Sequence, residues 1–179
     1  MKIVITGGPC SGKSTIIEQL ENLGYNIVEE VALELIEEEN KGDKNIYPWT
    51  DTKRFQSRVN KRQIEKEKFL DDKIHILDRS IIDSIAYMKH YNNNIPKYVD
   101  LFAKKSYYDM ILFLEMLPEK YWYKTRNGKD RMHSYESGVE IHKKILSTYK
   151  GYGYKPLIIS YDTIDKRMRI IKDRIDKVL

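Results

Sequence analysis

The eight residues from Gly7 to Ser14 read Gly-Gly-Pro-Cys-Ser-Gly-Lys-Ser and match the pattern G-x-x-x-x-G-K-[ST] at every fixed position. Glycines let the backbone curl so that successive N–H groups face inward and bind an anion. Lys13 supplies an ammonium group for the β- and γ-phosphates, and the Ser14 hydroxyl is an oxygen ligand of the kind that Mg²⁺ takes. The motif therefore predicts a nucleoside triphosphate site with Mg²⁺. The predicted binding residues are Gly8, Pro9, Cys10, Ser11, Gly12, Lys13, Ser14 and Thr15.

A second group with possible chemistry, Asp78-Arg79-Ser80, directly follows the apolar stretch Ile74–Leu77. That position is the carboxyl end of a predicted strand, where open α/β sheets bind their ligands. Asp78 can hold Mg²⁺ through water, and Arg79 can bind a transferring phosphate or an acidic group on the substrate. Ser80 and Asp83 form a capping box that begins the next helix, which accounts for Ser80 without a catalytic role.

The segment Tyr121–Arg131 contains four cations flanked by aromatic residues. A phosphoryl-transfer enzyme needs positive charge close to the γ-phosphate and water kept out of the site. We therefore expect a small lid at about residues 121–133 that brings Arg126 or Arg131 to the transferred group. An ordinary solvated loop is the alternative.

Two adjacent carboxylates, Glu29 and Glu30, end a second short strand. A carboxylate at this place can accept a proton from a substrate hydroxyl or hydrogen-bond to the substrate. Charge at a strand end is common, so the alternative is a surface role. Gln56 and Gln63, on a later helix, are candidates for reading a base or an amide of the substrate.

The long charged helix predicted at Thr52–Leu70 places Arg54, Arg58 and Arg62 on one face. This stripe can line an acceptor site or bind an acidic partner, and we favour a solvated face. The four histidines lack metal-ligand spacing, so no zinc site is expected. For Cys10, we favour a small filler residue in the loop over a redox role.

These residues require a scaffold of alternating strands and helices, which predicts a parallel sheet covered on both faces. The apolar runs predict strands at Lys2–Thr6, Asn26–Glu29, Ile74–Leu77, Met110–Leu114 and Leu157–Ser160. The helical patterns predict helices at Ser14–Leu23, Ala32–Glu39, Thr52–Leu70, Ile82–Tyr91, Pro96–Lys105, Glu136–Tyr149 and Thr163–Val178.

The composition bounds the class of protein. A length of 179 residues suits one domain over residues 1–179, and a single cysteine excludes a disulfide framework. No apolar run approaches the length of a membrane span, and the N-terminus does not resemble a signal peptide, so we expect a cytoplasmic protein. The net charge of +5 suits a protein that handles phosphates, contact with nucleic acid or membranes, or simply a well-solvated surface.

The phosphate-binding motif, the Asp-Arg-Ser group and the cationic loop together resemble the kinase branch of the P-loop NTPases, which includes deoxynucleoside, thymidylate and nicotinamide riboside kinases. More closely, the chain resembles the small AAA-type predicted ATPases with a NadR-like kinase domain. The matching stretches span almost the full length: Ile3–Thr15, Gly24–Ala32, Leu77–Tyr87, Tyr108-Asp109 and Tyr149–Tyr154.

This resemblance implies a three-layer α/β fold with a five-stranded parallel sheet in the order 2-3-1-4-5, and ATP with Mg²⁺ at the carboxyl ends of the strands. By motif position it implies phosphate and Mg²⁺ ligands at Lys13 and Ser14, a Mg²⁺-side acid at Asp78, a substrate-side residue at Arg79 and a lid arginine at Arg126 or Arg131. Leu33 stands where the family pattern suggests an arginine, so the acceptor does not carry over. A single acid, Glu115, follows the strand Met110–Leu114, which disfavours a ring-forming motor.

The favoured function is an ATP- and Mg²⁺-dependent phosphotransferase acting on a small molecule such as a nucleoside, a nucleotide or a related metabolite. The first alternative is a nucleotide-dependent switch, using ATP or GTP, with slow hydrolysis. A further alternative is nucleic-acid binding through the arginine stripe, which no recognised motif supports. A kinase that phosphorylates the 5′ end of a polynucleotide would combine nucleic-acid binding with phosphoryl transfer. The oligomeric state stays open.

Overall fold

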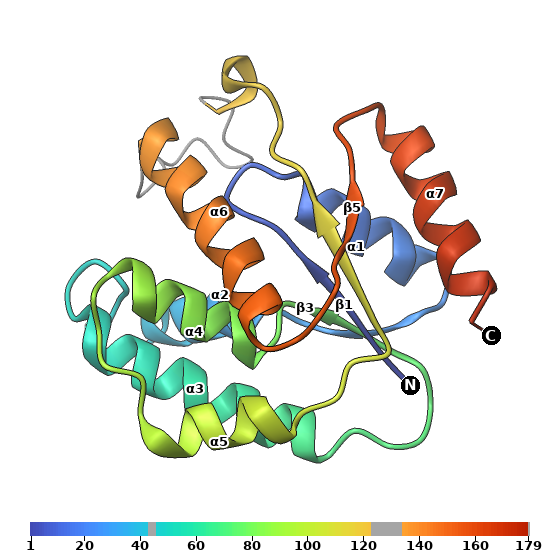
Figure 1. Ribbon diagram of the computed structural model, residues 1–179. Helices are drawn as coiled ribbons and strands as arrows, with labels where there is room; N and C mark the ends of the chain where they lie inside the picture. Colours follow the sequence, from blue (N-terminus) through green and yellow to red (C-terminus); the bar gives the residue numbers. More distant parts are fainter. Residues whose placement is uncertain (43–45, 123–133, 179) are drawn as a thin grey trace.

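A computed structural model describes residues 1–42, 46–122 and 134–178. Its centre is a sheet of five parallel strands in the order β2-β3-β1-β4-β5 (Figure 1). The strands are β1 (Lys2–Thr6), β2 (Asn26–Val28), β3 (His75–Asp78), β4 (Met110–Leu114) and β5 (Leu157–Ile159). The expected order 2-3-1-4-5 is confirmed, and each strand lies within one residue of its predicted bounds. All five carboxyl ends therefore meet at one edge of the sheet.

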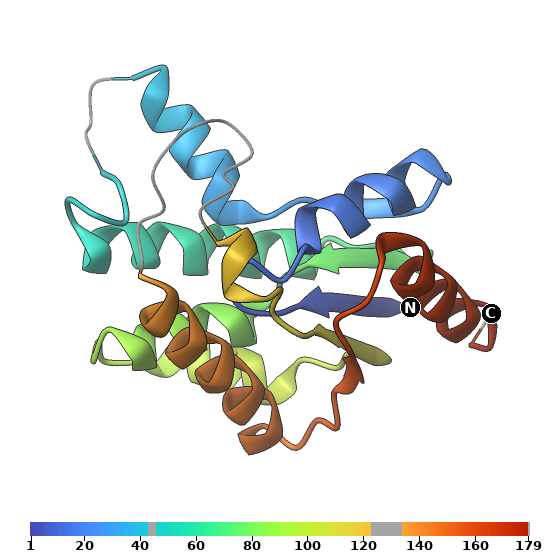
Figure 2. The ribbon, with the colours of Figure 1, turned by 90° about the horizontal axis from the view of Figure 1, so that it is seen from above.

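Helices cover both faces of this sheet, which gives three layers (Figure 2). The helices are α1 (Lys13–Asn22), α2 (Val31–Asn40), α3 (Thr52–Lys68), α4 (Ile81–His90), α5 (Lys97–Lys105), α6 (Tyr135–Gly151) and α7 (Ile164–Asp176). Each begins and ends within two residues of its prediction. A short 3-10 turn at Glu119–Tyr121 was not predicted, because a single turn has no periodicity to detect.

The layers follow from the two-residue period of a strand. In β1, Ile3 and Ile5 are fully buried against α1 and α7, whereas Val4 points to the opposite face and packs with α4, α5 and α6. A third apolar cluster joins α2 to α3 and contains Leu35 and Phe55. This cluster holds the α2–α3 pair beside the carboxyl edge of the sheet, where it forms a wall of the site described below.

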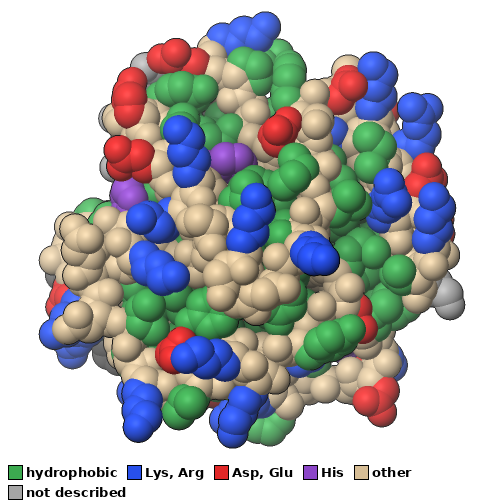
Figure 3. Space-filling view, viewed as in Figure 1, with side chains coloured by type: hydrophobic (Ala, Val, Ile, Leu, Met, Phe, Trp, Pro, Cys, Tyr) green, Lys and Arg blue, Asp and Glu red, His purple; other side chains and the backbone are tan. Residues whose placement is uncertain are grey.

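None of the helices in the described ranges is long and apolar enough to cross a bilayer. On the face seen in Figure 3, Lys and Arg side chains are spread among hydrophobic and acidic ones.

Candidate functional site

The glycine-rich loop connects the end of β1 to the start of α1 and curls through the left-handed backbone region. Cys10 has a φ of 60° and Gly12 a φ of 75°. Gly7 is required for another reason, since a Cβ there would lie 2.6 Å from the Leu114 carbonyl oxygen of the adjacent strand. This geometry gives successive N–H groups the concave arrangement that binds phosphate at a helix N-terminus.

The loop forms one wall of a cleft of about 450 Å³. Its lining combines all eight predicted binding residues with Glu30, Leu33, Arg79, Leu117 and Tyr121. Two cations, Lys13 and Arg79, thus share this cleft with the carboxylate of Glu30, although the three residues come from distant parts of the chain. Such a cleft can hold the phosphates of a nucleotide.

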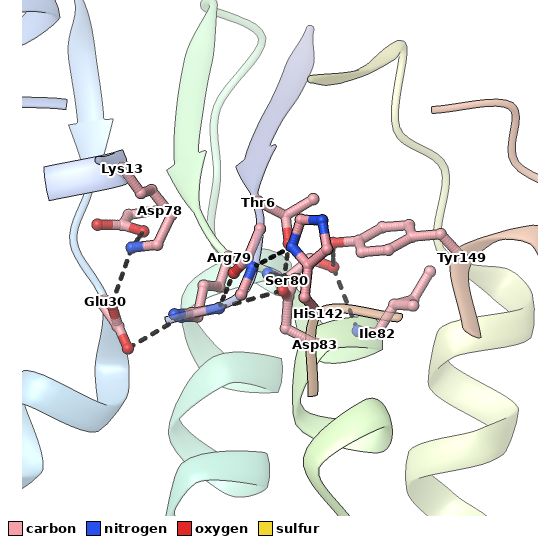
Figure 4. Close-up of polar contacts among 12 residues, drawn as sticks. Thr6, Lys13, Glu30, Asp78, Arg79, Ser80, Ile82, Asp83, His142 and Tyr149 are labelled. Atoms are coloured by element: carbon pink, nitrogen blue, oxygen red, sulfur yellow. Dashed lines mark hydrogen bonds and ion pairs between the residues drawn. The ribbon is translucent and has the colours of Figure 1, made fainter. Parts of the chain in front are cut away.

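Lys13 is only 5% exposed and lies between two carboxylates (Figure 4). Its Nζ donates to Asp78 Oδ1 and, over 3.0 Å, to Glu30 Oε2. Burying an ammonium group is costly unless it is paired in this way. An incoming triphosphate would compete with these two carboxylates for Lys13.

Glu30 bridges Lys13 and Arg79 in the polar network of Figure 4. Its Oε1 lies 3.0 Å from Arg79 Nε, on the side opposite Lys13. Burial opposes the negative charge, but the two cations outweigh it and lower the pKa of Glu30 to about 2. For Asp78, burial raises the pKa, with Lys13 opposing. Glu30 is therefore an ionised carboxylate throughout the neutral range.

Arg79 directs its guanidinium into the site because its backbone turns at a φ of 74° directly after β3. Few residues other than glycine adopt this conformation, and it persists only when its surroundings fix it. Arg79 Nη1 donates to the Gly7 carbonyl at 3.0 Å, and the guanidinium lies 5.5 Å from the centre of the Tyr87 ring. The same side chain thus contacts both the phosphate-binding loop and Tyr87 on α4.

Asp83 also pairs with Arg79, with its Oδ1 3.5 Å from Arg79 Nη1. Its carboxylate also accepts from the Thr6 hydroxyl, from the Ser80 N–H at 2.9 Å and from the Tyr149 hydroxyl at 2.5 Å. The capping box predicted for Ser80 and Asp83 is present. Besides capping α4, Asp83 therefore links β1 and α6 to each other next to Arg79.

A second pocket, of about 160 Å³, adjoins the first on the far side of Glu30 and Arg79. Its walls come from α2, α3 and α4 and include apolar and aromatic side chains: Val31, Ala32, Leu33, Ile36, Pro48, Phe55, Val59, Tyr87 and Tyr91. Gln56 is buried there with its Oε1 3.1 Å from the Ser84 hydroxyl. Gln63 also lines the pocket, but its amide donates to Glu67 at 3.0 Å. Both glutamines thus line the pocket, each with one amide atom already in a hydrogen bond.

The structure separates the two predicted strand-end carboxylates. Glu30 joins Lys13 and Arg79, whereas Glu29 is exposed and lines neither of the two pockets above, although it lines the cavity that also contains Ser14 and Asp78. The predicted lid arginines, Arg126 and Arg131, lie outside the described residues, so the lid stays a prediction.

Two members of the arginine stripe on α3 form ion pairs across the α2–α3 interface. Arg58 pairs with Glu38 and Glu39, and Arg62 pairs with Glu38. The favoured interpretation, a solvated face, is therefore incomplete. Neither residue lines the second pocket, and the pairing gives no support to nucleic-acid binding.

The residues predicted to bind Mg²⁺ fit that ion. Ser14 and Asp78 line one cavity beside the loop and offer hydroxyl and carboxylate oxygens, the donors that Mg²⁺ prefers. Within the described residues, no group of three or more His, Cys, Asp or Glu side chains is arranged to hold a metal ion. This donor set suits an ion that also takes phosphate oxygens and water as ligands.

His142 contacts the loop from α6 and was not singled out by the sequence, where its position has no motif. Its Nδ1 accepts a hydrogen bond from the Gly8 N–H at 3.1 Å. A Cβ at Gly8 would lie 2.6 Å from the His142 Cβ, so the glycine permits the close approach of α6. Burial lowers the pKa of His142, with Glu115 opposing.

This pairing predicts a pH dependence of stability. The unfolded chain takes up a proton on His142 near pH 6.5, whereas the folded protein takes it up only at lower pH. The free energy of unfolding should therefore fall as the pH drops below about 6.5, and His142→Gln should make that fall shallower. Urea unfolding at pH 7.5, 6.5 and 5.5 measures this, with His90→Gln as a control for loss of a histidine elsewhere. If the free energy of unfolding falls equally steeply with decreasing pH in wild type and in His142→Gln, the lowered pKa of His142 is contradicted.

The parallel sheet order, the loop and the residues at the carboxyl edge define the fold of the kinase branch of the P-loop NTPases. The chain belongs to the AAA domain family, whose model matches residues 2–167. No curated protein matches it by sequence.

Solved structures agree on the fold. The chain is similar to a deoxyadenosine kinase from M. mycoides, with a TM-score of 0.71 and 19% identity over 100% of both chains. It is similar to a NadR protein in complex with NR, with a TM-score of 0.71 and 22% identity over 98% of this chain and 50% of that one. A thymidylate kinase from Candida albicans gives a TM-score of 0.65 and 18% identity over 98% and 91%. At these identities the likeness defines the fold and not the substrate.

Proposed function

We propose that this protein transfers the γ-phosphoryl group of ATP, with Mg²⁺, to a hydroxyl group of a small nucleoside-like acceptor. The observation that carries the proposal is the position of Glu30 and Arg79, which line both the phosphate-binding cleft and the adjoining pocket. A switch or a simple nucleotide-binding protein does not need a second pocket whose polar groups meet the phosphate end of the first.

In this reaction the acceptor oxygen forms a bond to the γ-phosphorus while the bond from that phosphorus to the ADP oxygen breaks. Ser14 and Asp78 would hold Mg²⁺, which would neutralise charge on the phosphates and orient them. Lys13 and Arg79 stabilise the charge on the phosphoryl oxygens. Glu30 orients the acceptor hydroxyl and accepts its proton. A carboxylate of such low pKa is a weak base, which suits a reaction whose catalysis is mostly positioning and electrostatics.

The acceptor pocket favours an uncharged molecule with a flat ring. Arg79, the cation among its described lining residues, is already paired with Glu30 and close to Asp83. The aromatic side chains of Phe55, Tyr87 and Tyr91 offer apolar surface for a ring, and Gln56 offers an amide to hydrogen-bond its edge. A nucleoside meets these requirements better than a nucleotide, whose phosphate would need a further cation. The deoxyadenosine kinase among the similar structures supports this class.

The lid at about residues 121–133, with Arg126 or Arg131 completing the charge around the γ-phosphate, remains part of the proposal. So does a single functional unit over residues 1–179.

The proposal is tested by incubating the protein with ATP, Mg²⁺ and a pooled panel of nucleosides, nucleotides, nicotinamide riboside and short oligonucleotides, followed by mass spectrometry. A nucleoside that becomes heavier by one phosphoryl group, with wild type and not with Lys13→Ala, supports it. A phosphorylated oligonucleotide would favour a 5′-end kinase instead. ADP formed slowly without a phosphorylated product would favour the switch.

Gln56 provides a prediction specific to the acceptor pocket. Gln56→Leu keeps the volume and removes the amide, so the acceptor loses a hydrogen bond in a buried place. We expect the KM for the acceptor to rise about tenfold, the cost of one such bond, while the KM for ATP stays unchanged. Steady-state kinetics with each substrate varied in turn measures this. Gln19→Leu, on α1, is the control, and an equal change in both KM values for Gln56→Leu would contradict the assignment.

A further inference from the structure

A buried arginine from the last helix reaches the outer side of the phosphate-binding loop. Arg167, on α7, is 2% exposed. Its Nη1 donates to the Ser11 carbonyl at 2.8 Å and its Nη2 to the Glu115 carbonyl at 3.4 Å. Figure 1 places α7 beside α1, the helix that follows the loop. The guanidinium therefore joins the loop to the chain just after β4.

The place of this arginine on its helix is unusual. The rest of the buried face of α7 is apolar: Met168, Ile171 and Ile175. An aliphatic side chain at this position would complete that face without the cost of burying a charge. The guanidinium must therefore contribute something that packing does not.

Three carbonyl groups of the loop accept hydrogen bonds from donors outside it. Arg79 donates to Gly7, the Leu117 N–H donates to Cys10 at 2.8 Å, and Arg167 donates to Ser11. In a trans peptide the carbonyl and the following N–H point in opposite directions. Holding the Ser11 carbonyl toward α7 thus directs the Gly12 N–H away from α7.

The geometry points to Arg167 as a positioning residue for nucleotide binding, which aims the Gly12 N–H at the phosphates and adds positive charge behind them. This inference rests on the proposed function, because it requires that the loop bind a nucleotide. Arg167 touches no phosphate in this role. It acts through the Ser11–Gly12 peptide, whose Gly12 carries a φ of 75°.

The test compares Arg167→Gln and Arg167→Lys with wild type by titration calorimetry using ADP and Mg·ATP. We expect Arg167→Gln to weaken both affinities about tenfold or more, since a hydrogen bond from a charged donor is worth that much. Arg167→Lys keeps the charge but not the two-pronged contact, so a smaller loss of about threefold is expected. The matched control is Arg169→Gln, on the exposed side of the same helix, which should bind as wild type does.

A second readout separates positioning from general loss of structure. The KM for the acceptor at saturating ATP should change less than about twofold in Arg167→Gln, because the acceptor pocket does not touch α7. Unchanged ADP affinity in Arg167→Gln would overturn the inference, as would an equal weakening of acceptor and nucleotide. If Arg167→Gln does not fold, Arg167→Lys decides, and wild-type affinity there overturns it. A wild-type protein that binds neither ADP nor ATP would instead overturn the proposed function.

Discussion

Replacing Lys13 with alanine is expected to reduce the rate of phosphoryl transfer by about 10³-fold or more, since it removes a charge aimed at the transferring group. Mass spectrometry of the product, or a coupled assay for ADP, measures this. Leu23→Ala is the control and should keep its activity, because Leu23 is exposed and lies just after the end of α1, the helix that begins at Lys13.

The same substitution should also cost stability, because Lys13 is buried between two carboxylates. Removing one partner of a buried ion pair typically costs about 3–5 kcal/mol. Adding Asp78→Asn to Lys13→Ala removes one of the stranded charges and should restore part of the free energy of unfolding without restoring activity. Wild-type turnover in Lys13→Ala would refute the role of the loop. A double variant no more stable than Lys13→Ala would refute the pairing.

Replacing Glu30 with glutamine is expected to lower kcat by about 10²-fold, the lower end of the contribution of a positioned proton acceptor, because Glu30 is a weak base. The change keeps the shape of the side chain but removes the charge that pairs with Lys13 and Arg79. The affinity for ADP should not fall, since Lys13 loses a competitor for the phosphates. Rapid-quench kinetics and ADP titration measure the two quantities.

Glu29→Gln is the matched control for this variant. It makes the same chemical change one residue away, on an exposed side chain, and should leave kcat within about twofold of wild type. Because the pKa of Glu30 in the protein without ligands is about 2, its ionisation should place no acid limb on kcat/KM above about pH 4. Equal losses in Glu29→Gln and Glu30→Gln would contradict the assignment of Glu30.

Most of the fold could be predicted from the sequence because its signals are local. The apolar runs that became β1 and β4 and the motif Gly7–Ser14 each fit within a few residues. The order of the strands came from resemblance, since periodicity does not say which strands are neighbours. The choice between Glu29 and Glu30 depends on how the chain turns from β2 into α2, which the sequence pattern leaves undecided.

The supporting residues of the site could not be predicted in the same way. His142 and Arg167 lie more than 130 positions from the loop residues that they contact, Gly8 and Ser11, and meet them only in the folded protein. Tyr149 packs in the core, and its hydroxyl also donates to Asp83, next to Arg79. Arg167 did carry a signal, a cation on the apolar face of an amphipathic helix, and that kind of mismatch is worth searching for in other sequences.

The bridge from Lys13 through Glu30 to Arg79 implies that the two ligands would bind cooperatively. A triphosphate that draws Lys13 to itself leaves Glu30 with more of its charge available to an acceptor hydroxyl, so each ligand would favour the other. Thermodynamic linkage requires this effect to be reciprocal: whatever factor ATP adds to the affinity for the acceptor, the acceptor adds to the affinity for ATP. Without ligands, Lys13 and Arg79 both pair with Glu30. When both ligands bind, contacts to the ligands replace part of this pairing.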